Sequence, residues 1–122
     1  MIPVAYDLPL GESIDARLRG AEGNLASQDP VSVFDNLRAA HIYSSIAGLP
    51  AHSSVVVLES RAYAMAVGIA LAALESGEPL VAWSNLSSIV DYAGFTGAPF
   101  TGLDDVRLLA RKALVLAFEK GF

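Results

Sequence analysis

The stretch Ser54–Asn85, SVVVLESRAYAMAVGIALAALESGEPLVAWSN, is the most informative about the fold expected of this chain. It opens with an apolar, β-branched run at 54–58 and closes with a second apolar run at 79–84. Between them lie the uncharged residues 62–74, enough for a helix of about four turns. A strand, a helix and a strand within roughly 30 residues are typical of a right-handed parallel βαβ unit. We therefore predict a βαβ unit over 54–84.

The flanking segments extend this unit to an α/β domain. The first eleven residues are expected to be extended, and residues 42–48 are expected to add a short strand. The expected fold is a small, mostly parallel sheet of three to four strands with helices packed on it. Residues 1–122 form one domain, because the length fits a single core. No internal repeat is evident in the sequence.

Besides a short surface helix over residues 12–23, three helices are expected outside the βαβ unit. Asp29 followed by Pro30 predicts a helix start, since a capping carboxylate precedes a proline in the first turn. That helix is expected to end near His41. A second helix is expected over 85–95, ended by Gly94 or Gly97. The third begins at a capping box formed by Thr101 and Asp104, carries a stripe of apolar residues at helical spacing that includes Leu103, and ends near Gly121.

The composition narrows the classes of function. Hydrophobic residues make up 53% of the chain and charged residues 17%. This composition is more apolar than usual. A domain of this size buries a limited share of its surface, so apolar side chains are expected in a contact between copies or with a partner protein. A helix buried within the monomer is the alternative explanation.

Charge and cysteine content exclude further classes. The net charge is −5 and the cations are scattered, which disfavours nucleic-acid binding. The chain has no cysteine, so disulfides and thiolate chemistry are excluded. Residues 1–11 lack the pattern of a signal peptide, and the 62–74 run is shorter than a membrane span, which needs roughly 20 residues. We expect an acidic protein that is cytoplasmic or part of an intracellular assembly, with no membrane contact.

Glu59 is the candidate catalytic residue, because it stands where the first predicted strand ends. Ligands of open parallel sheets bind at the carboxyl ends of the strands, and a partly desolvated carboxylate there can act as a base. Ser84 and Asn85, at the end of the second predicted strand, are the candidate ligand-binding residues. The alternative is that Glu59 pairs with Arg61 at the rim and has no chemical role.

Residues 33–85 resemble the pyrimidine-binding domain of thiamine-diphosphate decarboxylases of the phosphonopyruvate and sulfopyruvate type. The likeness lies in ESRAYAMAVGIALA, a glutamate followed by an alanine-rich helix, and in FDNLRAAHIYSSIAGLP before it. The resemblance implies that Glu59 hydrogen-bonds the aminopyrimidine ring of thiamine diphosphate, which is held with magnesium. The family's Gly-Asp-Gly…Asn motif for the magnesium diphosphate is absent, so a partner subunit would have to supply it.

A second stretch, VGIALAALESGEPLVAWSN, is similar to a segment of nucleoside deoxyribosyltransferases. In that family a nucleophilic glutamate lies inside the helix. The corresponding position here is Ala66, so this resemblance implies a chain without that family's chemistry.

Two functions from different classes follow. The favoured one is a non-catalytic interaction or structural subunit that assembles with itself or with a partner protein, without a cofactor. Its interface is expected to include Tyr63, Met65, Phe95 and Phe100, the last two in a glycine-rich loop. The alternative is a subunit or remnant of a thiamine-diphosphate enzyme that binds its ligand near Glu59. No metal site is expected, because His41 and His52 lack an obvious third ligand.

Overall fold

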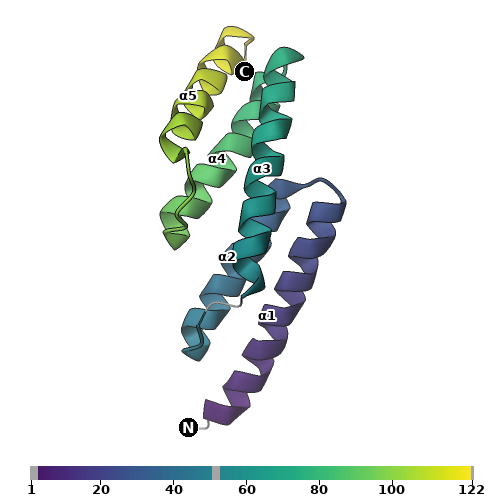
Figure 1. Ribbon diagram of the computed structural model, residues 1–122, viewed down its shortest axis with the longest axis vertical. Coiled ribbons are helices and arrows are strands. Elements are labelled where there is room, and N and C mark those ends of the chain that lie inside the picture. Colours follow the sequence, from purple (N-terminus) through teal and green to yellow (C-terminus); the bar gives the residue numbers. More distant parts are fainter. Residues whose placement is uncertain (1–2, 51–52, 122) are drawn as a thin grey trace.

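The computed structural model describes residues 3–50 and 53–121, with side chains from Gly11 onward, and this part of the chain is helical without a strand. The helices are α1 (Pro3–Ala26), α2 (Pro30–Ala47), α3 (Ser54–Glu75), α4 (Pro79–Thr96) and α5 (Leu103–Glu119). In Figure 1, α1 and α2 lie together at one end of the long axis, α4 and α5 lie together towards the other, and α3 runs between the two pairs. The predicted α/β fold, its parallel sheet and its βαβ unit are therefore wrong.

The burial pattern explains why the predicted strands are helices. In α3 the buried positions follow the helical period from the first turn onward: Val55, Leu58, Glu59, Ala62, Ala66, Ala70 and Ala73. Val56 and Val57 are 65% and 57% exposed. The 54–58 run is therefore not buried on both faces, as a central strand would be. The run at 79–84 is the first part of α4, and residues 42–47 form the last turns of α2.

The buried side of α3 is built largely from alanine, and its exposed side also carries apolar residues such as Val56, Val57 and Leu71. Ala62, Ala66 and Ala70 are fully buried, and α3 contacts α1, α2 and α4. Small side chains let the neighbouring helices approach this side of α3 closely. Of the described helices, α3 is also the one that is long and apolar enough to cross a membrane by length and composition, a test that core helices of soluble proteins pass as well. The prediction that its apolar run was too short counted only residues 62–74.

Local signals at helix ends are confirmed in part. The Asp29 prediction is confirmed: its Oδ1 accepts a hydrogen bond from the backbone N–H of Ser32 at 3.2 Å, as an N-cap residue does. Gly97 ends α4 in a left-handed conformation. The predicted capping box at Thr101 is wrong, because α5 is preceded by Gly102 without a side-chain cap.

The structure reveals an internal repeat that was not evident in the sequence. Segment 29–50 aligns with segment 78–99, and the identical pairs are Pro30/Pro79, Asn36/Asn85, Leu37/Leu86, Tyr43/Tyr92, Gly48/Gly97 and Pro50/Pro99. Their backbones agree as well. Asp29 and Glu78, which precede α2 and α4, have φ of −120° and −115°, and the glycines that end these helices have φ of 68° and 75°.

Burial follows the same repeat. Both residues are buried at the aligned positions Pro30/Pro79, Val33/Ala82, Leu37/Leu86, Ala40/Ile89 and Ser44/Ala93. The helices α2 and α4, each the second helix of a hairpin, therefore share one pattern of burial and of helix ends. Stacked helical hairpins bury their apolar faces against their neighbours, which is the architecture of helical-repeat proteins.

The repeat leads to a stability prediction at Gln28. Gln28 has φ of 58°, whereas the aligned residue in the second hairpin is Gly77 with φ of 75°. A left-handed backbone costs a residue with a side chain about 1–2 kcal/mol. Glycine removes this cost but also increases the conformational entropy of the unfolded chain, which offsets part of the gain. Gln28→Gly is therefore expected to raise the free energy of unfolding by about 0.5–1 kcal/mol. Urea denaturation measures the change. The reciprocal Gly77→Gln is the matched variant and should lower stability; equal stability of both variants would contradict the argument.

Candidate functional site

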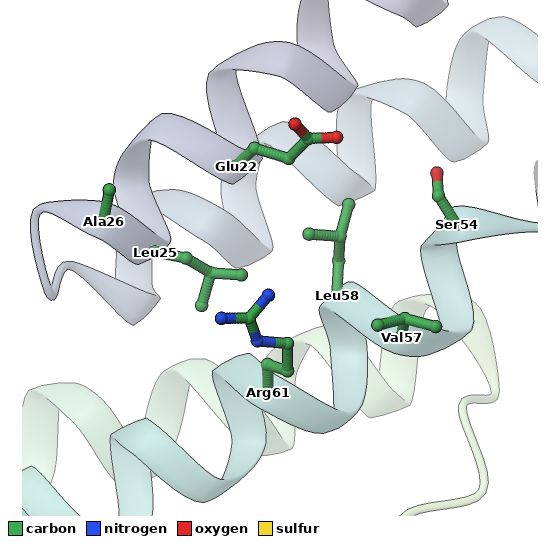
Figure 2. Close-up of a pocket in the computed structure, with 7 residues that line it drawn as sticks. All are labelled: Glu22, Leu25, Ala26, Ser54, Val57, Leu58 and Arg61. Carbon is green, nitrogen blue, oxygen red and sulfur yellow. The ribbon is translucent and has the colours of Figure 1, made fainter.

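A pocket of about 400 Å³ separates the end of α1 from the start of α3 (Figure 2). Leu25, Ala26, Val57 and Leu58 supply apolar lining, Ser54 lies at one end, and Glu22 and Arg61 carry opposite charges on its two sides. With one acid and one cation among its lining residues, the pocket has no surplus of either charge that would select one kind of ion. Glu22 is the one acid among the lining residues, so this pocket has no pair of acids for general acid–base catalysis, and we place the candidate site elsewhere.

Glu59 lies in the second turn of α3 and not at a strand end. Its carboxylate is largely buried, and Oε2 accepts a hydrogen bond from the hydroxyl of Tyr92 on α4. His41 on α2 completes the group: its Nε2 lies 3.1 Å from the Tyr92 hydroxyl and 3.7 Å from Glu59 Oε2. This Glu59–Tyr92–His41 cluster joins three helices at the boundary between the two hairpins.

The cluster keeps the Tyr92 hydroxyl protonated. Burial raises the pKa of Tyr92 well above its ordinary value, and the hydrogen bond and negative charge of Glu59 raise it further. The ring itself is fully buried, with its centroid 5.0 Å from that of Phe34. Tyr92 is therefore a permanent donor to the Glu59 carboxylate. This arrangement suits a structural role, because it stabilises a carboxylate in the protein interior.

The other candidate ligand residues make local contacts. Asn85 is buried, and its Nδ2 donates to the carbonyl oxygen of Val81 one turn earlier in α4, at 2.9 Å. Ser84 is exposed on the same helix. The hydrogen bonds of the described residues link neither side chain to Glu59.

Three of the four candidate interface residues pack against the core of their own chain. Tyr63 donates to the carbonyl oxygen of Thr101, and its ring is stacked on Phe100 with centroids 4.8 Å apart. Met65 is partly buried against the same core. Phe95 differs, because it is exposed. Of this set, Phe95 is the side chain that offers an apolar surface to a partner; membership in an interface stays a prediction for all four.

Phe95 lines a groove between α2 and α4 beside the Glu59–Tyr92–His41 cluster. The groove has a volume of about 380 Å³ and is lined by His41, Ile42, Ser45 and Ile46 of α2 and by Phe95 and Thr96 of α4. Ile46 and Phe95, on its two sides, are 66% and 57% exposed. We call this surface the α2–α4 groove. Its lining combines the apolar side chains of Ile42, Ile46 and Phe95 with the polar side chains of His41, Ser45 and Thr96, and His41 connects it to the buried cluster.

Arg38 contacts Phe95, one of the residues that line this groove. Its guanidinium carbon lies 5.5 Å from the centre of the Phe95 ring, a cation–π contact. The Arg38 Nε is buried without a hydrogen-bond partner, and no carboxylate in the described part of the chain forms an ion pair with this arginine. An arginine that is partly desolvated and lacks an anion is unusual, since buried cations are normally paired. Arg38 therefore lies beside the α2–α4 groove, at Phe95, without an ion-pair partner in the described part of the chain.

Sequence reasoning missed Arg38 and Tyr92. Arg38, His41 and Ser45 are spaced as one side of α2, and this spacing was available as a signal. Tyr92 repeats Tyr43 of the first hairpin, a signal that depends on recognising the repeat.

The described residues contain no group of three or more histidine and acidic side chains that could hold a metal ion. His52, one of the two histidines considered for such a site, lies outside them. No protein-family model, curated protein or solved structure matches this chain.

Proposed function

We propose that this protein is a non-catalytic interaction subunit that assembles with copies of itself through the α2–α4 groove. The observation that carries the proposal is the pair of large apolar side chains, Ile46 and Phe95, that stand exposed on either side of one groove. Exposed apolar side chains that surround a depression are typical of protein contact sites.

The repeat supports this assignment. Ile46 and Phe95 occupy aligned positions of the two hairpins, as do Ser45 and Gly94 before them. The same position is therefore apolar and exposed twice, once on α2 and once on α4. In helical-repeat proteins, partners bind to surfaces assembled from equivalent positions of successive repeats.

The chemistry of the cluster favours assembly over catalysis. The carboxylate of Glu59 accepts a hydrogen bond from the Tyr92 hydroxyl. Because the pKa of Tyr92 is raised, this hydroxyl stays protonated near neutral pH and is not the phenolate that a nucleophile requires. Such a network links α2, α3 and α4 in one arrangement, which supports the shape of the groove above it.

Light scattering after gel filtration tests the proposal. At micromolar concentration the parent protein is expected to have a mass greater than the 12.8 kDa of one chain. Ile46→Glu is expected to weaken association by at least about tenfold, because it places a charge in an apolar contact, a change worth about 1.4 kcal/mol or more. Val56→Glu is the matched control: it puts the same charge on an equally exposed valine of α3 and should leave the mass unchanged.

Two outcomes would contradict the proposal. One is a parent protein that stays at 12.8 kDa up to high micromolar concentration. The other is an Ile46→Glu variant that associates as the parent does. Circular dichroism of each variant shows that the fold is retained, as expected for substitution of an exposed side chain.

A further inference from the structure

We propose that the pocket between the end of α1 and the start of α3 binds a small zwitterion with an apolar body, the chemistry of a free apolar amino acid. We call this cavity the α1–α3 pocket. It shares no lining residue with the α2–α4 groove, so the inference is independent of the proposed self-assembly. The residues that line it are Glu22, Leu25, Ala26, Ser54, Val57, Leu58 and Arg61.

The apolar part of the lining is held in place by the core. Leu25 of α1 and Leu58 of α3 are 6% and 4% exposed, and both belong to the buried apolar cluster of the domain. Val57, which is 57% exposed, extends this apolar surface outward. The volume of about 400 Å³ lies within the range of roughly 300–1,000 Å³ that is usual for small-molecule sites. The pocket therefore offers a formed apolar surface to a small ligand.

Two opposite charges lie on the sides of this apolar surface. Figure 2 shows Glu22 on α1 and Arg61 on α3, with Leu25 and Leu58 between them in this view. Both charged side chains are exposed, and neither forms an ion pair within the described part of the chain. In particular, they do not pair with each other across the pocket. Each charge is therefore available to a ligand.

The balance of these charges selects the class of ligand. A ligand with only a carboxylate would be attracted by Arg61 and repelled by Glu22, and a ligand with only an ammonium group would meet the reverse. A zwitterion satisfies both side chains, because its carboxylate accepts from the guanidinium and its ammonium donates to the Glu22 carboxylate. An apolar body attached to these groups covers the leucines between them.

The exposure of the two charged side chains limits the strength of binding. Water and salt screen both contacts, so we expect a dissociation constant on the order of 1 mM for an apolar amino acid. Such an affinity suits reversible binding of an abundant small molecule and is within reach of a titration followed by NMR chemical shifts.

Titration of the parent protein with L-leucine is the first test. L-Leucine should shift the backbone amide signals of Leu25 and Leu58 and leave those of Ile46 and Phe95, at the α2–α4 groove, unchanged. Three related compounds each lack one part of the ligand: 4-methylpentanoate lacks the ammonium group, 3-methylbutylamine lacks the carboxylate, and glycine lacks the apolar body. Each should bind at least about tenfold more weakly than L-leucine.

Two variants should change the selectivity and not merely weaken binding. Glu22→Gln leaves Arg61 without an opposing charge, so this variant should prefer 4-methylpentanoate to L-leucine. Arg61→Gln should prefer 3-methylbutylamine for the converse reason. Both positions are exposed, so both variants are expected to fold. Glu75→Gln, at an exposed position at the far end of α3, is the matched control and should bind L-leucine as the parent does.

Three outcomes would overturn the inference. The first is an absence of shifts at Leu25 and Leu58 with about 10 mM L-leucine, roughly ten times the expected dissociation constant. The second is equal affinity for L-leucine and the two analogues of single charge. The third is Glu22→Gln and Arg61→Gln variants with the selectivity of the parent. None of these results bears on self-assembly, and a monomeric parent that binds L-leucine at this pocket would overturn only the proposed function.

Discussion

Ala66→Arg is expected to lower the free energy of unfolding by more than about 4 kcal/mol, which is enough to unfold many domains of this size. Ala66 is fully buried on the alanine side of α3. An arginine there would force the neighbouring helices apart, and its charge would enter the interior without a partner. The measurement is thermal denaturation followed by circular dichroism, with soluble yield as a first indicator.

Ala64 provides the matched control. It lies just before Ala66 on the same helix and is exposed. Because arginine and alanine have similar helix propensities, Ala64→Arg should change the free energy of unfolding by less than about 0.5 kcal/mol. If Ala66→Arg melted within a degree or two of Ala64→Arg, the alanine side of α3 would have to be open to solvent, and the helix arrangement described above would be incorrect.

Tyr92→Ala is expected to lower the free energy of unfolding by about 3–5 kcal/mol. The ring is fully buried between the hairpins, and its removal leaves a cavity beside Phe34 and Phe100. It also leaves the Glu59 carboxylate without the hydroxyl that donates to it. Urea denaturation at neutral pH measures the total loss.

Tyr92→Phe separates the hydroxyl from the ring. It should cost about 1–3 kcal/mol, the usual cost of a buried polar group left without its hydrogen bond. Glu59→Gln keeps an acceptor for the hydroxyl, so it should cost less than Tyr92→Phe. If Tyr92→Phe matched the parent in stability, the hydrogen bond to Glu59 would contribute nothing, and the cluster would not hold the hairpins together.

The same variant tests the pH dependence. The pKa of Tyr92 in the folded protein lies above the ordinary 10.0, first because of burial and then because of Glu59. The folded protein therefore keeps this proton when the unfolded chain has lost it. The resulting stabilisation is complete below about pH 10 and is lost as the pH rises further, by up to about 1.4 kcal/mol per pH unit. Over the first pH unit above that point, Tyr92→Phe should show a smaller decline in stability than the parent.

Several features of the fold were open to prediction because they depend on short-range chemistry. Asp29 caps α2 through a contact to Ser32 in the first turn, and Pro30 is favourable in the first helical turn of any chain. The apolar stripe of the last helix follows the helical period, and the helix is found at Leu103–Glu119. The sequence also leads to Glu59 as an unusual carboxylate, although for the wrong reason.

The strand predictions failed because the burial of side chains against other helices outweighs the preference of β-branched residues for strands. Val55, Val56 and Val57 favour a strand by propensity, yet only Val55 is buried, and the helical spacing of buried residues begins there. The repeat is hard to see in the sequence for a related reason. The two segments share burial and backbone conformation at positions where their residue types differ. Gln28 and Gly77 share a left-handed backbone without sharing a residue type.

Residue order alone was enough to locate the start of α2 and the apolar stripe of α5, to pick out one carboxylate in an apolar stretch, and to show that apolar side chains are plentiful. The partners of that carboxylate, Glu59, are decided by how the helices pack. His41, Glu59 and Tyr92 are far apart in the chain, and they come together because α2, α3 and α4 pack across the alanine side of α3. The same packing leaves Arg38 on Phe95 without an anion. Long-range packing of this kind has no local signal, because it minimises exposed apolar area over the whole chain and not within any one segment.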